Sequence, residues 1–414
     1  MITQTQPKAR FLYLDSIRAL AAIYVVMHHA SLQYYKFGDT GLSGFKKYFV
    51  KFFSYGHLSV DIFIVLSGFS LMIAVINNNY VLKGGNMAFF KRRFLRIVPP
   101  YYATIILCLL LIKLVIGGNT STLWGMTIPV TKWDIASHFL MVHDIFNSSG
   151  LRINYSLWSI SVEYRIYFLF PIFIILWKKM GPIITLAISV LYTIFGTLLL
   201  IFINNYYNNI GLIFSGVCPY IILFTLGMIA ADISLSQSKM ANKVRKFYNH
   251  LSVQKILIFL IIYIAGYQSL SMLTKGVGIS SEYEFFISLE IKDISVGIFA
   301  AIFLTICAVS IKTDKSIPWI FRFLNWKPLV FVGTFSYSLY LIHPPLIQLL
   351  SKYILAPFNL QTYTNTYLLI LVGTPVCIAV SYLFFLLFER PFLNLGAQKS
   401  RLAVANKTST DPAP

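Results

Sequence analysis

Long apolar runs recur along almost the whole chain, separated by shorter polar segments that are rich in Lys and Arg. A helix needs about 20 apolar residues to cross the hydrocarbon core, so these runs predict about ten membrane-spanning helices. The spans are expected at roughly 12–34, 58–77, 97–116, 155–177, 182–203, 211–232, 253–270, 291–311, 329–351 and 366–388. The pattern therefore predicts an all-α, polytopic transmembrane helical bundle formed by one integral-membrane domain, residues 1–391.

The basic residues predict the orientation of this bundle. With the N-terminus placed in the cytoplasm, 23 of the 34 Lys and Arg residues fall on the inner side, 10 on the outer side and Arg165 within a span. Cytoplasmic loops carry an excess of Lys and Arg, so both termini are expected in the cytoplasm. The first ten residues lead into a span without a cleavage site, which predicts a retained helix. The composition of 392–414 predicts a disordered cytoplasmic tail.

Composition excludes several classes of protein. With 57% hydrophobic and 12% charged residues, the chain is unlike a soluble domain, in which about 25% of residues are charged. The net charge is +20, but the basic residues lie between apolar runs and form no single patch, which argues against nucleic acid as a partner. All four cysteines fall inside predicted spans without paired spacing, so neither disulfides nor a metal site are expected.

The first apolar run carries ionisable residues at both ends. Arg18 and His29 are eleven residues apart, which puts them on one helical face about 16 Å apart, whereas His28 is turned away. This face either forms the wall of a polar path, or Arg18 anchors the helix at one membrane surface and the histidines lie in the opposite headgroup layer. Ionisable residues inside a span are costly, and we therefore expect partners elsewhere in the chain.

A carboxylate in the fourth span is the first candidate partner. Ser156, Ser159 and Glu163 share one helical face, and Arg165 lies on another. Counted from the expected membrane boundaries, Glu163 and His29 reach a similar depth. The two groups can neutralise each other or share a proton. The alternative is a structural tie from Glu163 to a His or Arg of a neighbouring helix.

Further candidate site residues lie in the outer halves of two predicted spans. Ser336, Tyr340 and His343 share a face, and the proline pair that follows ends or kinks their helix. A single buried His is more often a packing residue. Asp61 lies near the start of the second span. Its carboxylate either stabilises the helix N-terminus through the helix dipole or belongs to the site, and the two interpretations are about equally good.

A basic cluster marks the inner end of the third span. Arg92, Arg93 and Arg96 lie at the same expected level as Arg18. The positive-inside rule alone explains such a cluster. However, guanidinium groups also match the geometry of phosphate, which makes a phosphorylated cytoplasmic ligand the second interpretation.

Taken together, these segments resemble the membrane acyltransferase 3 family, the bacterial O-acyltransferases that modify cell-surface and exported carbohydrates. They run in family order from about 11 to 391, and two departures are serines 16 and 59 where glycines are common. The matching stretches are Leu14-Asp15-Ser16-Ile17-Arg18-Ala19-Leu20-Ala21 with His29, Val60-Asp61-Ile62-Phe63 with Ser67-Gly68-Phe69, Arg92-Arg93 with Arg96 and Pro99, Leu157-Trp158-Ser159-Ile160-Ser161-Val162-Glu163, Gly333-Thr334-Phe335-Ser336-Tyr337-Ser338-Leu339-Tyr340-Leu341-Ile342-His343, and Glu389-Arg390-Pro391.

The resemblance implies transfer of an acyl group, usually acetyl, from acyl-coenzyme A to a carbohydrate hydroxyl, without a metal. It also implies a multi-pass protein of the bacterial inner membrane that contacts lipids and either completes the transfer or works with separate glycan-assembly proteins. His29 is the expected catalytic histidine and Glu163 its acidic partner. The expected donor-binding residues are Arg18, Arg92, Arg93 and Arg96, and the expected supporting or acceptor-side residues are His343, Asp61, Ser159 and Tyr340.

Two mechanisms and a second class of function stay open. His29 acts as a general base on the acceptor hydroxyl, with an imidazole pKa of about 6.5 suited to that task, or it carries the acyl group itself. A transporter of carbohydrate or lipid-linked sugar would also have many helices and buried polar groups, but it needs no acyl donor. A purely structural membrane partner would need no aligned Arg18 and His29.

Overall fold

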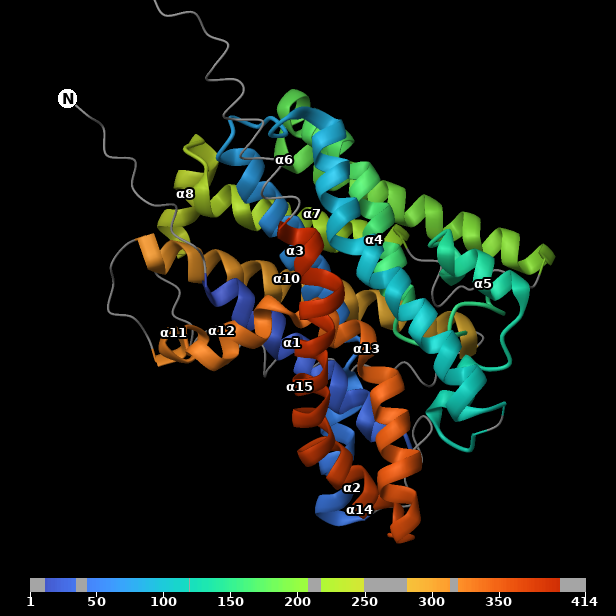
Figure 1. Cartoon of the computed structure of the whole chain (residues 1–414). Coiled ribbons are helices and arrows are strands. Elements are labelled where there is room, and N and C mark those ends of the chain that lie inside the picture. Colours follow the sequence, from blue (N-terminus) through green and yellow to red (C-terminus); the bar gives the residue numbers. More distant parts are fainter. Residues whose placement is uncertain are drawn as a thin grey trace, which may run out of the picture.

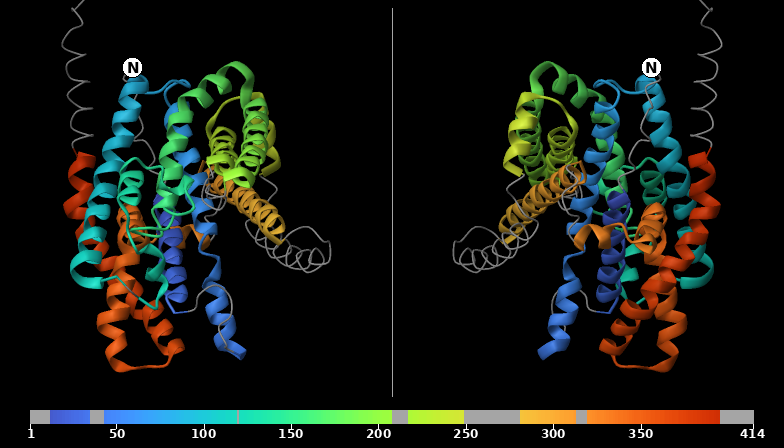
Figure 2. Two further views of the ribbon diagram at one scale, coloured as in Figure 1. Left: turned by 90° about the vertical axis from the view of Figure 1, so that its right-hand side faces the viewer. Right: turned by 90° about the vertical axis from the view of Figure 1, so that its left-hand side faces the viewer.

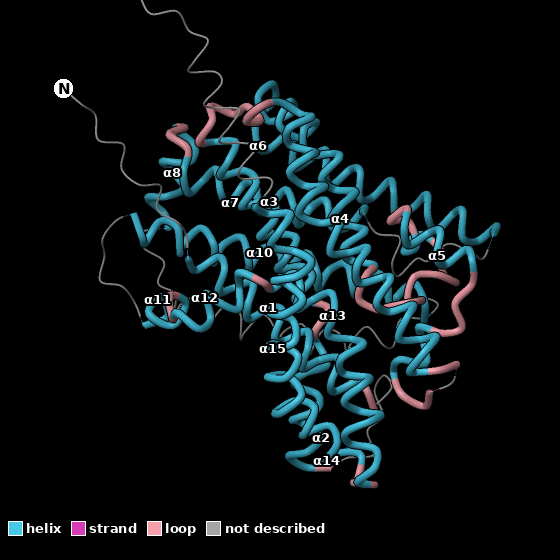
Figure 3. Tube along the Cα trace, in the orientation of Figure 1, coloured by secondary structure: helices cyan, strands magenta, loops and turns pink. Residues whose placement is uncertain are grey.

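The computed structural model describes residues 12–34, 43–118, 120–207, 217–248, 281–312 and 319–394, and within these ranges the chain is helical without strands (Figure 3). Each predicted span in these ranges falls on a helix, which confirms the all-α class. The predicted span 253–270 lies outside the described residues, as does most of the expected tail; helix continues to Asn394.

Fourteen helices are labelled in Figures 1 and 3. They are α1 (Leu12–Leu32), α2 (Gly44–Phe52), α3 (Leu58–Ile76), α4 (Gly85–Leu111), α5 (Lys132–Phe139), α6 (Trp158–Tyr207), α7 (Val217–Leu235), α8 (Lys239–Tyr248), α10 (Ser281–Lys312), α11 (Trp319–Leu324), α12 (Lys327–Thr334), α13 (Ser336–Leu349), α14 (Thr362–Leu368) and α15 (Thr374–Phe384). Wider π-helical turns extend α4, α13, α14 and α15 through Ile116, Leu355, Gly373 and Glu389. Short 3-10 turns cover Phe53–Tyr55, Leu123–Thr127, His143–Ile145 and Ala356–Phe358.

Five helical segments of the described chain are long and apolar enough to cross a membrane, or seven if two sharply bent pairs each count as one span. The expected number of about ten is therefore not reached in this part of the chain. The predicted spans 155–177 and 182–203 form one long helix, α6, interrupted at Gly181. Helices α12 and α13 meet at an angle of 76° where one straight span was expected. Helix α1 is not among these segments, because its charged residues and histidine pair lower its mean hydropathy.

Helix α1 lies in the interior of the bundle. It packs against α3, α12, α13 and α15, and the side views show α6, α7 and α10 on one side of it with α13 to α15 on the other (Figures 1 and 2). Small buried residues, among them Ala19 and Ala22, permit this close packing. At Gly333 of α12, an added Cβ would lie only 2.0 Å from the carbonyl oxygen of Asp15. The polar face of α1 is thus largely covered by other helices, although Arg18 and His29 stay partly exposed.

Helices α3 and α7 are in backbone contact. A Cβ added at Gly68 would lie 2.1 Å from the carbonyl oxygen of Phe224, and one added at Gly227 would lie 2.1 Å from that of Val65. Only glycine allows two helices to approach this closely. The contact fixes the position of α3, whose serines face the cavity described below.

The chain enters α6 deep inside the bundle. Ile153, Asn154 and Leu157 are completely buried. The side-chain amide of Asn154 donates to the carbonyl oxygen of Leu341 in α13 at 2.9 Å. Helix α6 therefore begins among the other helices rather than at the edge of the bundle, where the sequence interpretation placed its first residues.

Candidate active site

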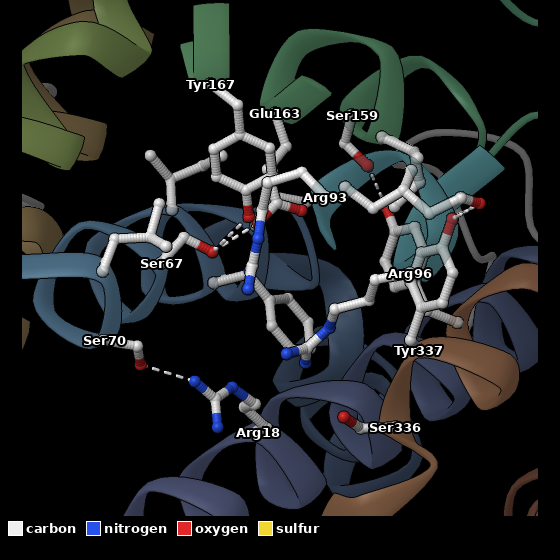
Figure 4. Close-up of a pocket in the computed structure, with 17 residues that line it drawn as sticks. Arg18, Ser67, Ser70, Arg93, Arg96, Ser159, Glu163, Tyr167, Ser336 and Tyr337 are labelled. Atoms are coloured by element: carbon white, nitrogen blue, oxygen red, sulfur yellow. Dashed lines mark hydrogen bonds between the residues drawn. The ribbon is translucent and has the colours of Figure 1, made fainter. Parts of the chain in front are cut away.

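A cavity of about 100 Å³ lies where α1, α3, α4, α6 and α13 meet. Three guanidinium groups line it, and Figure 4 shows those of Arg18, Arg93 and Arg96 directed into the same space from α1 and α4. Arg93 and Arg96 share a face of α4 by their i, i+3 spacing. Three like charges around one cavity repel each other, so a bound anion would stabilise the arrangement.

Two of the three arginines have defined contacts. Arg18 donates to Asp15 at 3.1 Å and to the Ser70 hydroxyl at 2.6 Å. Arg93 lies over the ring of Tyr167, 5.9 Å from its centroid, and its Nε has no hydrogen-bond partner among the described residues. A buried donor without a partner costs about 1–3 kcal/mol, so Arg93 is prepared to bind an acceptor such as a phosphate oxygen.

Glu163 belongs to this cavity. The hydroxyls of Ser67 and Tyr167 both donate to its Oε1, and the carboxylate lies within electrostatic reach of Arg18 and Arg93. In the described part of the chain Glu163 makes no hydrogen bond to His29, so the direct pairing expected from the sequence is absent. The cause is the deep start of α6. Tyr155 lies beside His29, and Glu163 follows roughly 10 Å further along the chain, beside Arg18 and Arg93.

The partner of His29 is His343. Nδ1 of His29 lies 2.8 Å from Nε2 of His343, and Nδ1 of His343 lies 3.2 Å from the carbonyl oxygen of Leu339. A carbonyl only accepts, so this network assigns the proton of neutral His343 to Nδ1 and leaves its Nε2 as acceptor. His29 must then donate through Nδ1–H. Its Nε2 carries the free lone pair, as a general base requires.

His28 lies on another face, as predicted. Its Nδ1–H donates to the carbonyl oxygen of Phe53 at 2.6 Å. Gly56 packs directly against the His28 ring, where an added Cβ would lie 2.3 Å away. This ring is held by the segment between α2 and α3 and does not contact the arginine cavity.

Tyr340 connects the cavity to the histidine pair. Tyr340 and Ser159 both line the cavity, and their hydroxyls share a hydrogen bond of 2.6 Å. The Tyr340 ring lies 5.7 Å from that of His343, centroid to centroid. The predicted residues Ser159, Tyr340 and His343 thus form a continuous line from the cavity towards His29.

Two predicted residues lie outside the cavity. Arg92 donates to the carbonyl oxygen of Lys83 at 2.8 Å, because it is turned about 100° around α4 from Arg93. Asp61 is buried against Asp293 of α10 rather than beside His29. Neither residue lines the cavity.

The sequence interpretation missed several cavity residues. Ser67 and Ser70 share one face of α3 by their i, i+3 spacing, and Tyr167 follows Glu163 by one turn of α6 at i, i+4. This spacing was the available signal, although hydroxyl residues inside spans are too common to single out without known neighbours. Within the described ranges, no cluster of three or more His, Cys, Asp and Glu side chains could hold a metal ion.

Comparison with known proteins gives a consistent result. The acyltransferase domain of the acyltransferase 3 family matches residues 11–386, in agreement with the resemblance carried by the sequence motifs. The O-acetyltransferase OatA of Staphylococcus aureus (strain NCTC 8325 / PS 47) is 26% identical over 393 residues, which cover 92% of this chain and 57% of the relative. The putative peptidoglycan O-acetyltransferase YrhL of Bacillus subtilis (strain 168) is 24% identical over 362 residues, or 81% of this chain and 48% of the relative.

The chain therefore spans about half the length of these curated relatives. No solved structure matches it.

Proposed function

Because the chain belongs to the acyltransferase 3 family, we propose that it is an O-acetyltransferase that transfers acetyl from cytoplasmic acetyl-coenzyme A to a hydroxyl of a cell-envelope carbohydrate. The observation that carries this proposal is one arginine-lined cavity joined through Tyr340 to a hydrogen-bonded histidine pair. Such an arrangement offers an anion-binding end and a proton-accepting end. The names of two relatives, an O-acetyltransferase and a putative peptidoglycan O-acetyltransferase, support the acetyl group and a glycan acceptor.

On the donor side, Arg18, Arg93 and Arg96 bind the phosphates of coenzyme A. Pockets that enclose a whole ligand of that size class measure about 300–1,000 Å³. The cavity here measures about 100 Å³, so it receives the diphosphate and the narrow pantetheine arm while the adenosine stays at the rim. Glu163, held by Ser67 and Tyr167, orients the arginines by its charge.

The reaction then takes place near His29. Nε2 of His29 accepts the proton of the acceptor hydroxyl as its oxygen attacks the thioester carbonyl carbon. The new C–O bond forms, the C–S bond breaks, and the proton passes to the leaving thiolate to give free coenzyme A. His343 holds His29 in the reactive tautomer, the orienting role that the sequence interpretation gave to Glu163.

The protein acts in the bacterial inner membrane with both termini in the cytoplasm, so donor and acceptor approach from opposite sides. The excess of inner Lys and Arg supports this orientation. The acceptor receives the acetyl group directly or through a separate glycan-assembly protein.

The test is transfer of radiolabelled acetyl from acetyl-coenzyme A into muramidase-solubilised peptidoglycan fragments by membranes that contain the protein. We expect label in the glycan that base treatment releases as acetate, with none in membranes lacking the protein. Protection of the purified protein against heat by acetyl-coenzyme A is the companion measurement. Uptake of sugar without any donor protection would contradict the proposal and indicate a transporter.

A further inference from the structure

A second cross-helix pair lies directly outward from the histidines. The side-chain amide of Gln33, the residue after α1, donates to Oε1 of Gln348 in α13 at 2.7 Å, about one turn beyond His29. Thr122 donates to the same oxygen at 2.7 Å, and the backbone N–H of Leu123 donates to the carbonyl oxygen of Gln33 at 3.2 Å. The segment before α5 is thereby fastened over the outer side of His29.

This region holds buried polar groups that lack partners. Oε1 of Gln33, Nε1 of Trp124 and the hydroxyl of Tyr155 are all buried without a hydrogen-bond partner in the ranges described. All three residues are at least nine-tenths buried. Each such group costs about 1–3 kcal/mol when it is left unpaired, so three of them in one place need an explanation.

Two of the residues that carry these groups form a chain of rings that reaches His29, and the third is close to His29 in sequence. The Tyr155 ring lies 4.8 Å from the His29 ring and 6.2 Å from the Trp124 ring, centroid to centroid. Gln33 follows His29 by one helical turn. His343 is completely buried, whereas the His29 residue as a whole retains partial exposure.

We propose that Gln33, Trp124 and Tyr155 form the acceptor subsite and bind hydroxyl groups of one sugar ring while its attacked hydroxyl contacts Nε2 of His29. This inference rests on the proposed function. A sugar carries neighbouring hydroxyls that each donate and accept, which matches one unpaired acceptor and two unpaired donors. The aromatic rings of Trp124 and Tyr155 supply apolar surface for the C–H faces of the sugar.

Removing one of these unpartnered groups should weaken acceptor binding without a loss of stability. The variants Tyr155→Phe and Trp124→Phe remove groups that have no partner in the free protein, so the Tyr155 change should leave thermal stability unchanged or slightly raised. Both variants should raise KM for muramidase-solubilised peptidoglycan fragments by about three- to tenfold, the value of one hydrogen bond. KM for acetyl-coenzyme A should stay the same, because the arginine cavity is untouched.

Tyr102→Phe is the matched control. The Tyr102 hydroxyl donates to the carbonyl oxygen of Phe139 at 2.7 Å and, among the described residues, makes no hydrogen bond or ring contact with His29 or His343, so this variant should lose stability without any change in acceptor KM. Unchanged acceptor KM in both Tyr155→Phe and Trp124→Phe, with active wild-type protein, would overturn the subsite alone. Absence of acetyl transfer by the wild-type protein would overturn the proposed function and the subsite together.

Discussion

At the scale of single residues, Arg18, Arg93 and Arg96 line the cavity, whereas the neighbouring Arg92 does not. Arg93→Ala and Arg96→Ala should each weaken acetyl-coenzyme A binding about tenfold to a hundredfold, because a charge-assisted phosphate contact is worth about 1.5–3 kcal/mol. Arg92→Ala should bind the donor almost normally, since Arg92 faces Lys83 and not the cavity. Donor affinity measured by calorimetry on purified protein checks this. Equal weakening in all three variants would indicate a general charge effect at the membrane surface.

The histidine pair gives a second prediction at this scale. His343→Ala removes the acceptor that fixes the His29 tautomer, so transfer should fall, by up to about 10²-fold, while donor affinity is kept. The double variant with His29→Ala should lose little more than His29→Ala alone, as groups that act as one unit do. Rates of acetyl transfer in membranes with matched protein amounts measure this. Losses that simply multiply would show that the two histidines work independently.

Part of the candidate site was predictable from residue types and spacing, and the rest depends on how far inside the bundle α6 begins. The basic cluster in the sequence predicted that Arg93 and Arg96 lie near Arg18, and the structure places all three at one cavity. However, Arg92 of the same cluster faces elsewhere. Helical phase alone placed Arg18 and His29 on one face of α1. Their roles in catalysis and donor binding stay predictions.

The partners of Glu163 were not predictable, because they depend on how far the chain enters the helical bundle before α6 begins. Asn154 fixes that depth through a contact with Leu341, 187 residues away.

At the scale of helices, the contact between α3 and α7 tolerates no side chain at Gly68 or Gly227. Gly227→Leu would drive a side chain into the backbone of α3, so we expect a loss of stability of about 1–3 kcal/mol or more and a lower melting temperature in detergent. Gly118→Ala is the control, because an added Cβ there meets nothing within 4 Å. Equal melting temperatures for Gly227→Leu and the wild-type protein would show that the two helices are further apart than described.

Hydropathy predicted the positions of the helices but not their breaks. Apolar runs are visible in the order of residues, so α3 lies where the sequence placed it, whereas α4 and α10 begin earlier than the predicted spans, at Gly85 and Ser281. The break at Gly181 has a glycine with a positive φ of 83°. The bends between α7 and α8 and between α12 and α13 contain no residue with positive φ, so no glycine of this kind marks them in the sequence. The 76° bend before α13 depends on packing against α1, which a single sequence does not reveal.

At the scale of the whole molecule, the proposal requires that the arginine side faces the cytoplasm. The loop 117–154 should lie outside the cell and the segment 233–251 inside. Exposed lysines provide the probes, Lys132 in the first and Lys243 in the second. A membrane-impermeant maleimide should label Lys132→Cys in intact cells and Lys243→Cys only after lysis. The reverse result would place the donor cavity on the wrong side for cytoplasmic acetyl-coenzyme A.

The most direct test of the central claim is the rate of acetyl transfer by His29→Ala in membranes with matched amounts of protein. If Nε2 of His29 accepts the proton of the acceptor hydroxyl, this variant should keep donor binding and lose transfer by about 10²-fold or more, as loss of a general base does. His28→Ala should lose far less transfer activity, because the His28 ring lies on another face of α1 and is hydrogen-bonded to the carbonyl oxygen of Phe53. Near-normal transfer by His29→Ala together with an inactive His28→Ala would contradict the account.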